Sequence, residues 1–206
     1  MSSDRFINDL TSSAARMGVR LDEVALDRFF LYYCELIRWN QHINLVSRNE
    51  PNWIRAHFLD SLAPQALDLV SGSERTVDLG SGAGFPGVPL KIVSPGMFLG
   101  MAEASGKKCV WLKHLVRILG LEEAEVLEGR FESLVKQGWG ASFDLAVSRA
   151  AAKPAKVLEQ AGNFLATGGR LLVYTTEDLV QKGTGKVHAY RVHGSRIPSV
   201  IWEVKF

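Results

Sequence analysis

The sequence predicts an α/β protein with a mostly parallel sheet, an antiparallel hairpin at one sheet edge and a helical amino-terminal extension. From Thr76 onward, short apolar runs alternate with helical patterns, which is typical of a parallel sheet with crossover helices on both faces. The last two apolar runs are separated only by a Gly/Ser/Pro turn, too short for a crossover helix. We therefore divide the chain into a helical extension, residues 1–70, and a Rossmann-like domain, residues 71–206, and expect them to form one continuous domain.

Composition places the chain among globular proteins of a reducing compartment. Its 206 residues are 47% hydrophobic and 22% charged, so the chain is long and apolar enough to bury a full core without disulfide bonds or structural metals. Cys34 and Cys109 form no CxxC pattern, which argues against a disulfide or a metal role. The amino terminus lacks a signal-peptide profile, and no apolar run is long enough to span a bilayer. We expect a cytoplasmic protein that does not bind membranes.

The net charge of +2 is distributed unevenly along the chain. Residues 181–206 contain five basic side chains and one acidic side chain, whereas residues 1–70 are slightly acidic. A protein that binds naked nucleic acid unaided usually has a more basic face. A nucleic-acid substrate of this chain would therefore have to supply shape and other contacts.

Three helices are expected in the extension. The first begins near the amino terminus and ends at Gly18, and the second has Asp22 as its N-cap. The third begins at Pro51, and Pro64 kinks or ends it. The apolar stripes expected to face the core are, in order, Phe6, Leu10, Ala14 and Met17; Leu26, Phe30, Tyr33 and Ile37; and Ile54, Phe58 and Leu62.

The remaining elements follow from changes in apolar spacing and from glycine and proline breaks. The predicted strands of the parallel part are residues 76–79, 97–102, 125–127, 143–147 and 170–175. The predicted helices between them are residues 89–93, 107–119, 132–136 and 155–165. The terminal hairpin is expected over residues 187–192 and 200–206.

A glycine-rich loop follows the first predicted strand. Gly80, Gly82, Gly84 and Gly87 fall within eight residues, which is more glycine than a tight strand–helix turn requires. Glycine permits positive φ and lets a ligand approach the backbone, while the next helix offers N–H groups at its start. The loop therefore predicts a nucleotide-sized site at the carboxyl end of the strand.

The end of the second strand narrows the choice of nucleotide. Glu103 lies about 20 residues beyond the loop, where a carboxylate binds the ribose of NAD or of S-adenosylmethionine. The tight Gly-x-Gly-x-Gly spacing, the lack of a long second βαβ half and the terminal hairpin favour S-adenosylmethionine. An NAD-dependent oxidoreductase remains the alternative. The scattered histidines have no metal-ligand spacing, so we expect no metal.

Several segments together resemble one known family. They include HFLDSL at residues 57–62 and DLGSGAGFPGVPL at residues 78–90. The other matching pieces, in family order, are residues 39–40, 44–45, 103, 107–108, 129–132 and 148–150. On these motifs the chain resembles, over nearly its whole length, the RsmG (glucose-inhibited division protein B) family of 16S ribosomal RNA guanine-N7 methyltransferases.

The resemblance implies a class I S-adenosylmethionine-dependent methyltransferase fold and transfer to N7 of a guanine in a 16S loop near the decoding centre. It implies an assembled or assembling small ribosomal subunit as the substrate, and we expect a monomeric enzyme. Cofactor contacts are expected from the loop and from positions matched to the family: Asp78, Gly80, Gly82, Phe85, Gly87, Glu103, Phe131, Glu132 and Arg149. After the fifth strand the family usually has Lys-Gly, whereas this chain has Tyr174-Thr175-Thr176.

The expected chemistry needs no catalytic general base. Guanine N7 carries a lone pair and no proton, so in-line positioning can supply most of the catalysis. Arg149 could bind the methionine carboxylate, a phosphate or guanine O6, and His57 could contact RNA or pin its helix to the core. Asn40 and Asn44 could shape the acceptor pocket or serve as turn residues. A non-catalytic, S-adenosylmethionine-binding ribosome-assembly factor is the second alternative.

Overall fold

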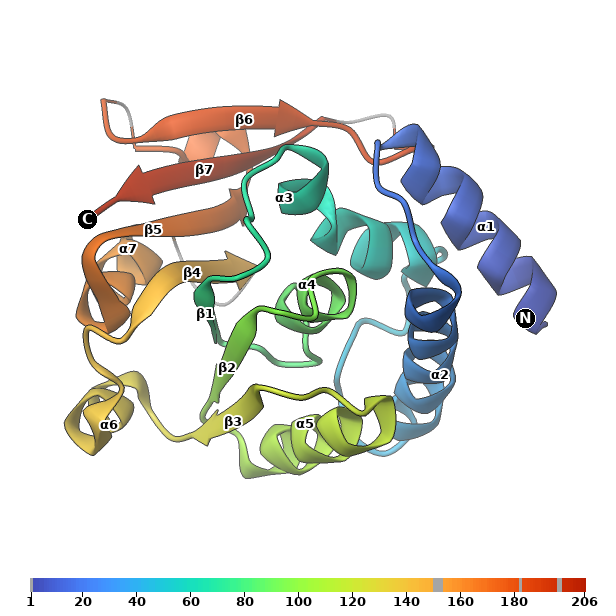
Figure 1. The fold of residues 1–206 in the computed structure, drawn as a ribbon, viewed down its shortest axis with the longest axis horizontal. Helices are drawn as coiled ribbons and strands as arrows, with labels where there is room; N and C mark the ends of the chain where they lie inside the picture. Colours follow the sequence, from blue (N-terminus) through green and yellow to red (C-terminus); the bar gives the residue numbers. More distant parts are fainter. Residues whose placement is uncertain (1, 150–153, 182, 196–197) are drawn as a thin grey trace.

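A computed structural model describes residues 2–149, 154–181, 183–195 and 198–206 (Figure 1). The strands form one sheet in the order β3-β2-β1-β4-β5-β7-β6. Their bounds are β1 Arg75–Leu79, β2 Phe98–Glu103, β3 Ala124–Glu128, β4 Phe143–Arg149, β5 Leu165–Thr175, β6 Lys186–Tyr190 and β7 Ser199–Lys205. Strands β1 to β5 are parallel, and β7 pairs antiparallel with both β5 and β6. The expected parallel sheet with an antiparallel hairpin at its edge is confirmed.

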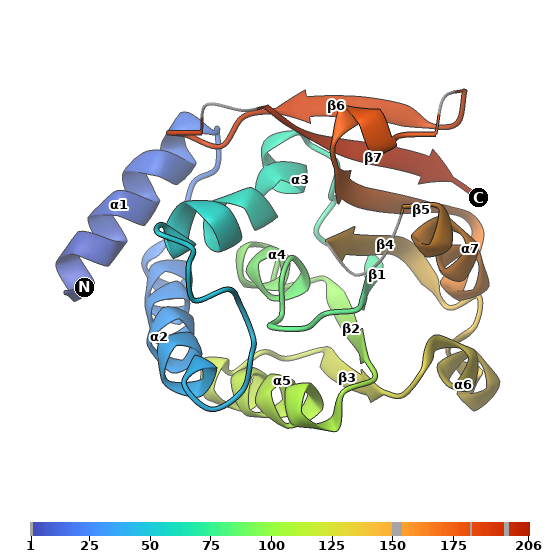
Figure 2. The same cartoon turned by 180° about the vertical axis from the view of Figure 1, so that it is seen from behind.

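Helices cover both faces of this sheet. One side carries α1 (Ser3–Arg16), α2 (Glu23–Asn40), the π-helix η1 (Ile54–Leu59), α3 (Ala63–Ala66), α4 (Gly87–Val93) and α5 (Gly106–Leu119) (Figures 1 and 2). The other carries α6 (Phe131–Leu134), the π-helix η2 (Val135–Trp139) and α7 (Pro154–Phe164), and a short 3₁₀ helix η3 spans Glu177–Leu179. None of the helices in the described part of the chain is both long enough and apolar enough to cross a membrane.

Two apolar cores lie on the two faces of the sheet because successive strand residues point to opposite sides. In β4, Leu145 and Val147 join the core with the amino-terminal helices, α4 and α5, whereas Ala146 joins the core under α7. The sheet order reverses between β1 and β4, which is where open α/β sheets bind ligands beyond the carboxyl ends of their strands.

The first helix is confirmed except for Met17, which follows the end of α1 and is half-buried. Phe6, Leu10 and Ala14 are buried on one face of α1. Gly18 follows at φ +83°, and the N–H groups of Gly18 and Val19 bond the carbonyls of Ala15 and Ala14. This is the Schellman motif that a glycine after a helix favours.

The predicted stripe of the second helix is wrong by one residue. The buried side chains of α2 are Ala25, Phe29, Tyr32 and Leu36. The predicted residues lie one position later, and Ile37 is 37% exposed. Part of the predicted stripe packs against α1, where the Phe6 ring lies 5.5 Å from Phe30 and 4.7 Å from Tyr33. Because α2 contacts α1, α4 and α5, its apolar face is wider than one stripe.

The third helix begins later than predicted and has a different form. Asn52 accepts the Arg55 N–H at 3.0 Å, and the helical turns begin at Trp53 rather than at Pro51. They continue as the π-helix η1. Pro64 neither kinks nor ends it but lies in the first turn of α3, where the missing N–H is tolerated.

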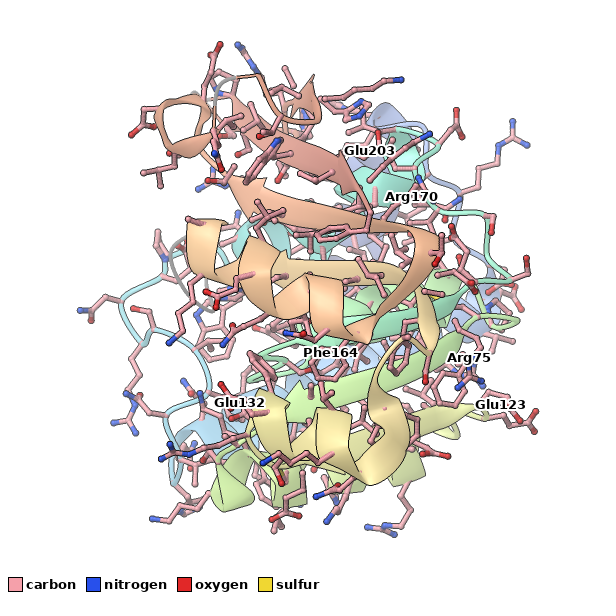
Figure 3. The ribbon with its side chains drawn as sticks, turned by 90° about the vertical axis from the view of Figure 1, so that its left-hand side faces the viewer. Arg75, Glu123, Glu132, Phe164, Arg170 and Glu203 are labelled. Atoms are coloured by element: carbon pink, nitrogen blue, oxygen red, sulfur yellow. The ribbon has the colours of Figure 1, made fainter. Side chains whose placement is uncertain are left out.

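The last parallel strand also begins earlier than predicted. β5 starts at Leu165, and the pairing with β4 shifts register between Phe143 and Leu145. Gly168, at φ +84°, lies in this irregular stretch, so the predicted glycine turn is a distortion within the strand. Beyond it, Arg170 pairs with Glu74 at 2.5 Å and with Glu203 at 3.2 Å, which ties β5 to β7 (Figure 3).

Candidate functional site

The glycine loop turns sharply away from the end of β1. Gly80, Gly82 and Gly84 have φ values of +76°, +56° and +103°, which are costly for any residue with a Cβ. The N–H groups of Gly80 and Ser81 bond the carbonyl of Ala102 at 2.9 and 3.2 Å, so the loop is tied to the end of β2. Backbone bonds thus fix the start of the loop.

The glycines of the loop differ in what surrounds them. A Cβ on Gly84 would lie 2.8 Å from the Tyr32 hydroxyl, and a Cβ on Gly87 would lie 2.8 Å from Asp78 Oδ2. Around Gly82, by contrast, nothing would come closer than 3.8 Å. Gly84 and Gly87 are therefore required by packing, whereas Gly82 is half-buried and a Cβ there would make only ordinary van der Waals contacts.

Asp78 supports the loop from below. It is fully buried, and its Oδ2 accepts the Gly87 N–H at 3.1 Å. Its Oδ1 is buried without a hydrogen-bond partner among the described residues. Burial raises the pKa of Asp78 to about 7, although the Gly87 N–H opposes the shift. The structure thus places this predicted cofactor residue behind the loop, at the turn into α4.

Glu103 lies at the rim of the loop with its carboxylate fixed. Its Oε2 accepts the Gly82 N–H at 2.9 Å, and its Oε1 accepts the Ser105 N–H at 2.8 Å. Each carboxylate oxygen has a second lone pair, so these bonds leave acceptor capacity for two ribose hydroxyls. These free acceptor positions fit the ribose hydroxyls of the nucleoside predicted for this position.

A cavity of about 180 Å³ opens at the carboxyl ends of β1 and β4. Gly80, Phe131 and Ser148 line it together with residues of α7. A second cavity of about 210 Å³ shares Phe131 with it and includes Glu132. In Figure 3, Glu132 lies at the side of the sheet where the strands end, away from Arg75 at the start of β1. Phe131 thus shares a cavity wall with Gly80 of the loop, and Glu132 lies in the wall of the neighbouring cavity.

Arg149, at the end of β4, is clamped to η1. Its Nη1 donates to the Ala56 carbonyl at 2.9 Å and to Asp60 Oδ2 at 3.0 Å, and its Nη2 lies 3.3 Å from His57 Nδ1. Its guanidinium carbon lies 5.1 Å from the centre of the Phe85 ring, within cation–π range. Arg149 thus joins the amino-terminal helices to the glycine loop.

His57 is stacked on the loop. Its ring centre lies 5.2 Å from that of Phe85, with 23° between the planes. Since Nδ1 faces an Arg149 donor, we assign the hydrogen to Nε2, which is buried with no partner in the described part of the chain. Burial, and secondly Arg149, lower the pKa of His57 to about 4, so the ring is neutral. His57 and Asp60 meet through Arg149.

Sequence reasoning missed the contribution of the terminal hairpin. Tyr190 of β6 donates to Asp60 Oδ1 at 2.6 Å, and Tyr174 of β5 donates to the Ser61 carbonyl at 2.8 Å. Tyr174 opens the segment that departs from the family pattern, and it binds the end of the η1 segment. No local signal marks Tyr190, because Asp60 lies 130 residues earlier in the chain.

The loop carbonyl of Ala83 is held by two donors that sequence reasoning also missed. The Tyr32 hydroxyl donates to it at 2.7 Å and the Trp111 indole at 2.9 Å. Trp111 lies on the buried face of α5, but the stripe predicted for the second helix held Tyr33 instead of Tyr32, and periodicity could not reveal either bond. Buried Tyr and Trp usually find such partners.

Asn40 and Asn44 lie away from these contacts. Asn40 is 3% exposed; its Oδ1 accepts the N–H groups of Leu45 and Val46, and its Nδ2 donates to the Val46 carbonyl. Asn40 therefore holds the turn after α2, and Asn44 is exposed on the same turn. Within the described residues, no group of three His, Cys, Asp or Glu side chains gathers as metal ligands would.

Solved structures share this fold at low sequence identity. Tyw2 of M. jannaschii in complex with AdoMet has 14% identity and a TM-score of 0.53, covering 66% of this chain and 69% of that chain. A precorrin-6y C5,15-methyltransferase from Geobacter metallireducens has 13% identity and a TM-score of 0.52, covering 78% of this chain and 90% of the other. The seven-stranded sheet is thus the class I S-adenosylmethionine-dependent methyltransferase fold, as expected.

Sequence relatives are closer. "Ribosomal RNA small subunit methyltransferase G" of Caldanaerobacter subterraneus is 38% identical over 175 residues, covering 84% of this chain and 73% of the relative. The protein of the same name from Dehalococcoides mccartyi is 35% identical over 197 residues, covering 95% and 83%. The family model GidB, described as rRNA small subunit methyltransferase G, matches residues 25–200. The chain therefore belongs to the RsmG/GidB family, the rRNA small subunit methyltransferase G family.

Proposed function

We propose that this chain transfers the methyl group of S-adenosylmethionine to N7 of a guanine in 16S ribosomal RNA, without a general base. One observation carries the proposal. The chain belongs to this family, and Glu103 holds its glycine loop. The loop meets the Arg149 clamp at Phe85, beside the point where the sheet order reverses. The groups that would bind the nucleoside and the clamp that would position the acceptor side are thus adjacent.

The residues of the loop fit the methyl donor. Glu103 would accept the ribose hydroxyls, and the missing side chain of Gly82, whose N–H Glu103 accepts, would let the nucleoside approach the backbone. Phe131 and Glu132 would border the adenine from α6, beside the cavity at Gly80. When bound, S-adenosylmethionine supplies a sulfonium-activated methyl group. Asp78 and Gly87 would contribute through the hydrogen bond between them, which keeps the loop in its conformation.

The acceptor side needs positioning rather than proton transfer. Because guanine N7 has no proton, the residues beside Phe85 have to orient the base and exclude water. Neutral His57, with its unpartnered Nε2–H, suits a donor contact to the base better than a charged imidazolium would. We assign Arg149 the role of a positioning residue, since its bonds to Ala56, His57 and Asp60 already engage both Nη atoms.

The proposal extends to the form of the substrate. The net charge of +2 is weak for gripping naked RNA, which favours an assembled or assembling small subunit that adds shape to the contact. We further propose that the enzyme acts as a monomer in the cytoplasm. Asn40 and Asn44 remain candidates for a role in substrate binding. Asn40 would act indirectly, by holding the turn that carries Asn44.

A methyl-transfer assay with labelled S-adenosylmethionine tests the proposal. The acceptors are small subunits from cells that lack the family enzyme, and the same 16S RNA stripped of protein. Label in 7-methylguanosine from subunits supports the function, and the stripped RNA reveals whether assembled shape is needed. Glu103→Ala is expected to lose turnover, with exposed Glu125→Ala as the matched control. Cofactor binding without label would overturn the proposed acceptor, and calorimetric preference for NAD would favour the oxidoreductase.

A further inference from the structure

A larger cavity, of about 720 Å³, lies among α1, α2, the segment before η1 and the turn after β6. We call it the amino-terminal cavity. We propose that it binds one unpaired nucleotide of the RNA substrate, next to the nucleotide that enters the methyl site. This inference rests on the proposed function, because it needs an RNA substrate. The volume lies within the range of about 300–1,000 Å³ that is usual for ligand pockets.

Two arginines in its wall are fixed by neutral partners. Arg48 Nη2 donates to the carbonyls of Asn40 and Gln41 at 3.0 and 3.1 Å, and Arg55 Nη1 donates to the Gly194 carbonyl at 3.0 Å. Carbonyl partners orient a guanidinium without cancelling its charge, and they leave further N–H groups for a phosphate. These two side chains are thus suited to a phosphodiester.

The acidic residues of the wall limit this charge without removing it. The Asp9 carboxylate lies 3.9 Å from the guanidinium of Arg5, a third arginine of the wall. Its negative charge is therefore balanced by Arg5 rather than by Arg48 or Arg55. Glu50 accepts the Asn52 N–H at 2.9 Å and stays close to its own turn. Arg48 and Arg55 therefore keep the cavity suited to a single phosphate rather than to a long polyanion.

Aromatic side chains complete the wall. Trp53 and Tyr33 are half-buried there, and the Tyr33 hydroxyl has no hydrogen bond with any residue that the structure describes. An aromatic face beside arginine side chains is typical of sites for single-stranded nucleic acid, where each base stacks and each phosphate pairs. A base on Trp53 would find donors for its edge at Tyr33.

A row of ring contacts links the wall of the amino-terminal cavity to the glycine loop. The ring centre of Trp53 lies 6.4 Å from that of His57, and His57 lies 5.2 Å from Phe85 of the glycine loop. The helix η1 contributes Arg55 to the cavity and Ala56 to the Arg149 clamp. An RNA strand that presents a guanine beside the glycine loop would therefore place its neighbour along η1, in this cavity.

The test is binding of a labelled single-stranded hexaribonucleotide, with the target guanine in its sequence, followed by fluorescence anisotropy. Trp53→Ala is expected to weaken binding about tenfold, since stacking of one base is worth about 1–3 kcal/mol. Arg55→Gln is expected to weaken it by a similar factor, because it removes the charge that pairs with the phosphate. Trp53→Phe should keep most of the affinity. Replacing both arginines, Arg48→Gln with Arg55→Gln, should reduce the slope of log affinity against log salt by about 0.7, the value for one phosphate, and each single variant should reduce it by less. The control is Arg20→Gln, at an exposed arginine outside the cavity, which should change nothing.

The same variants are assayed on small subunits, where KM for the subunit should rise while Kd for S-adenosylmethionine stays unchanged. Unchanged hexanucleotide affinity and salt slope would overturn the inference, as would guanosine monophosphate binding as tightly as the hexanucleotide. If Trp53→Ala does not fold, the two arginine variants decide. Formation of 7-methylguanosine by the unaltered protein tests the proposed function separately, so the failure of one can be told from the failure of the other.

Discussion

The glycine loop and the Arg149 clamp form adjacent parts of one site in opposite ways. The loop is built from residues 78–87 and the end of the next strand, with its conformation set by positive φ and by space that excludes a Cβ. The clamp joins Asp60, Phe85, Arg149 and Tyr190, which lie far apart in the chain, through their side chains, and adds the Ala56 carbonyl. A locally encoded part should fail through backbone strain, whereas an assembled part should fail through unpaired polar groups.

The largest expected effect is from Gly84→Ala. A Cβ there would combine φ +103° with a 2.8 Å approach to the Tyr32 hydroxyl, so we expect a loss of about 3 kcal/mol in unfolding free energy. Urea unfolding measures it, and S-adenosylmethionine binding should weaken in parallel. Gly18→Ala is the matched control, because φ is +83° there but nothing lies within 4 Å; it should cost about 1 kcal/mol. Equal losses of unfolding free energy in the two variants would show that the approach of the new Cβ to the Tyr32 hydroxyl contributes nothing.

Arg149→Gln should have the next largest effect. It leaves Asp60, which is only 19% exposed, without its cation, and we expect a loss of about 2 kcal/mol and a fall in kcat of at least tenfold. Arg149→Lys should recover the charge but not the three-acceptor geometry. Unfolding curves and steady-state kinetics check both variants. Full activity of Arg149→Gln would remove the clamp from the mechanism.

Tyr190→Phe should have a smaller effect on the same cluster. It deletes one hydrogen bond to Asp60 and keeps the ring, so we expect about 1 kcal/mol of destabilisation. If Tyr190 positions the clamp, kcat should fall while Kd for S-adenosylmethionine stays constant. Tyr174→Phe, which loses a bond to the Ser61 carbonyl on the same segment, is the comparison. A change in cofactor affinity alone would contradict a role on the acceptor side.

The smallest effect is a pair of opposed pH dependences. The pKa of Asp78 is raised from 3.8 to about 7, so between these values the folded state holds a proton that the unfolded chain has released, and stability falls as pH rises. The pKa of His57 is lowered from 6.5 to about 4, so the unfolded chain holds the extra proton and stability rises with pH. The two slopes oppose each other between about pH 4 and 6.5.

Single variants should separate the two slopes. Asp78→Asn leaves the His57 contribution, so stability should rise more steeply with pH than in the unaltered protein. His57→Gln leaves the Asp78 contribution, so stability should fall with pH. Urea unfolding at intervals from pH 4 to 7.5 measures both. Parallel curves for all three proteins would mean that neither group titrates differently on folding.

Several features of the fold and site could be predicted because their signals are local. The alternation of apolar runs predicted the parallel sheet, and the short last turn predicted the hairpin. Glu103 followed from its distance beyond the loop, and its bond to the Gly82 N–H places it there. The second stripe failed because a helix with neighbours on several sides buries more than one line of residues, which periodicity cannot resolve.

The sequence by itself determined the βαβ order, the glycine loop and the family, since each depends on residues close together in the chain or on a continuous motif. Only the tertiary structure decided that Arg149 is clamped by η1, that Tyr190 holds Asp60, and that Gly84 and Gly87 are closely packed while Gly82 is not. The physical reason is that these contacts depend on which side chains the sheet and its helices bring together. Neither φ preference nor apolar spacing carries that information.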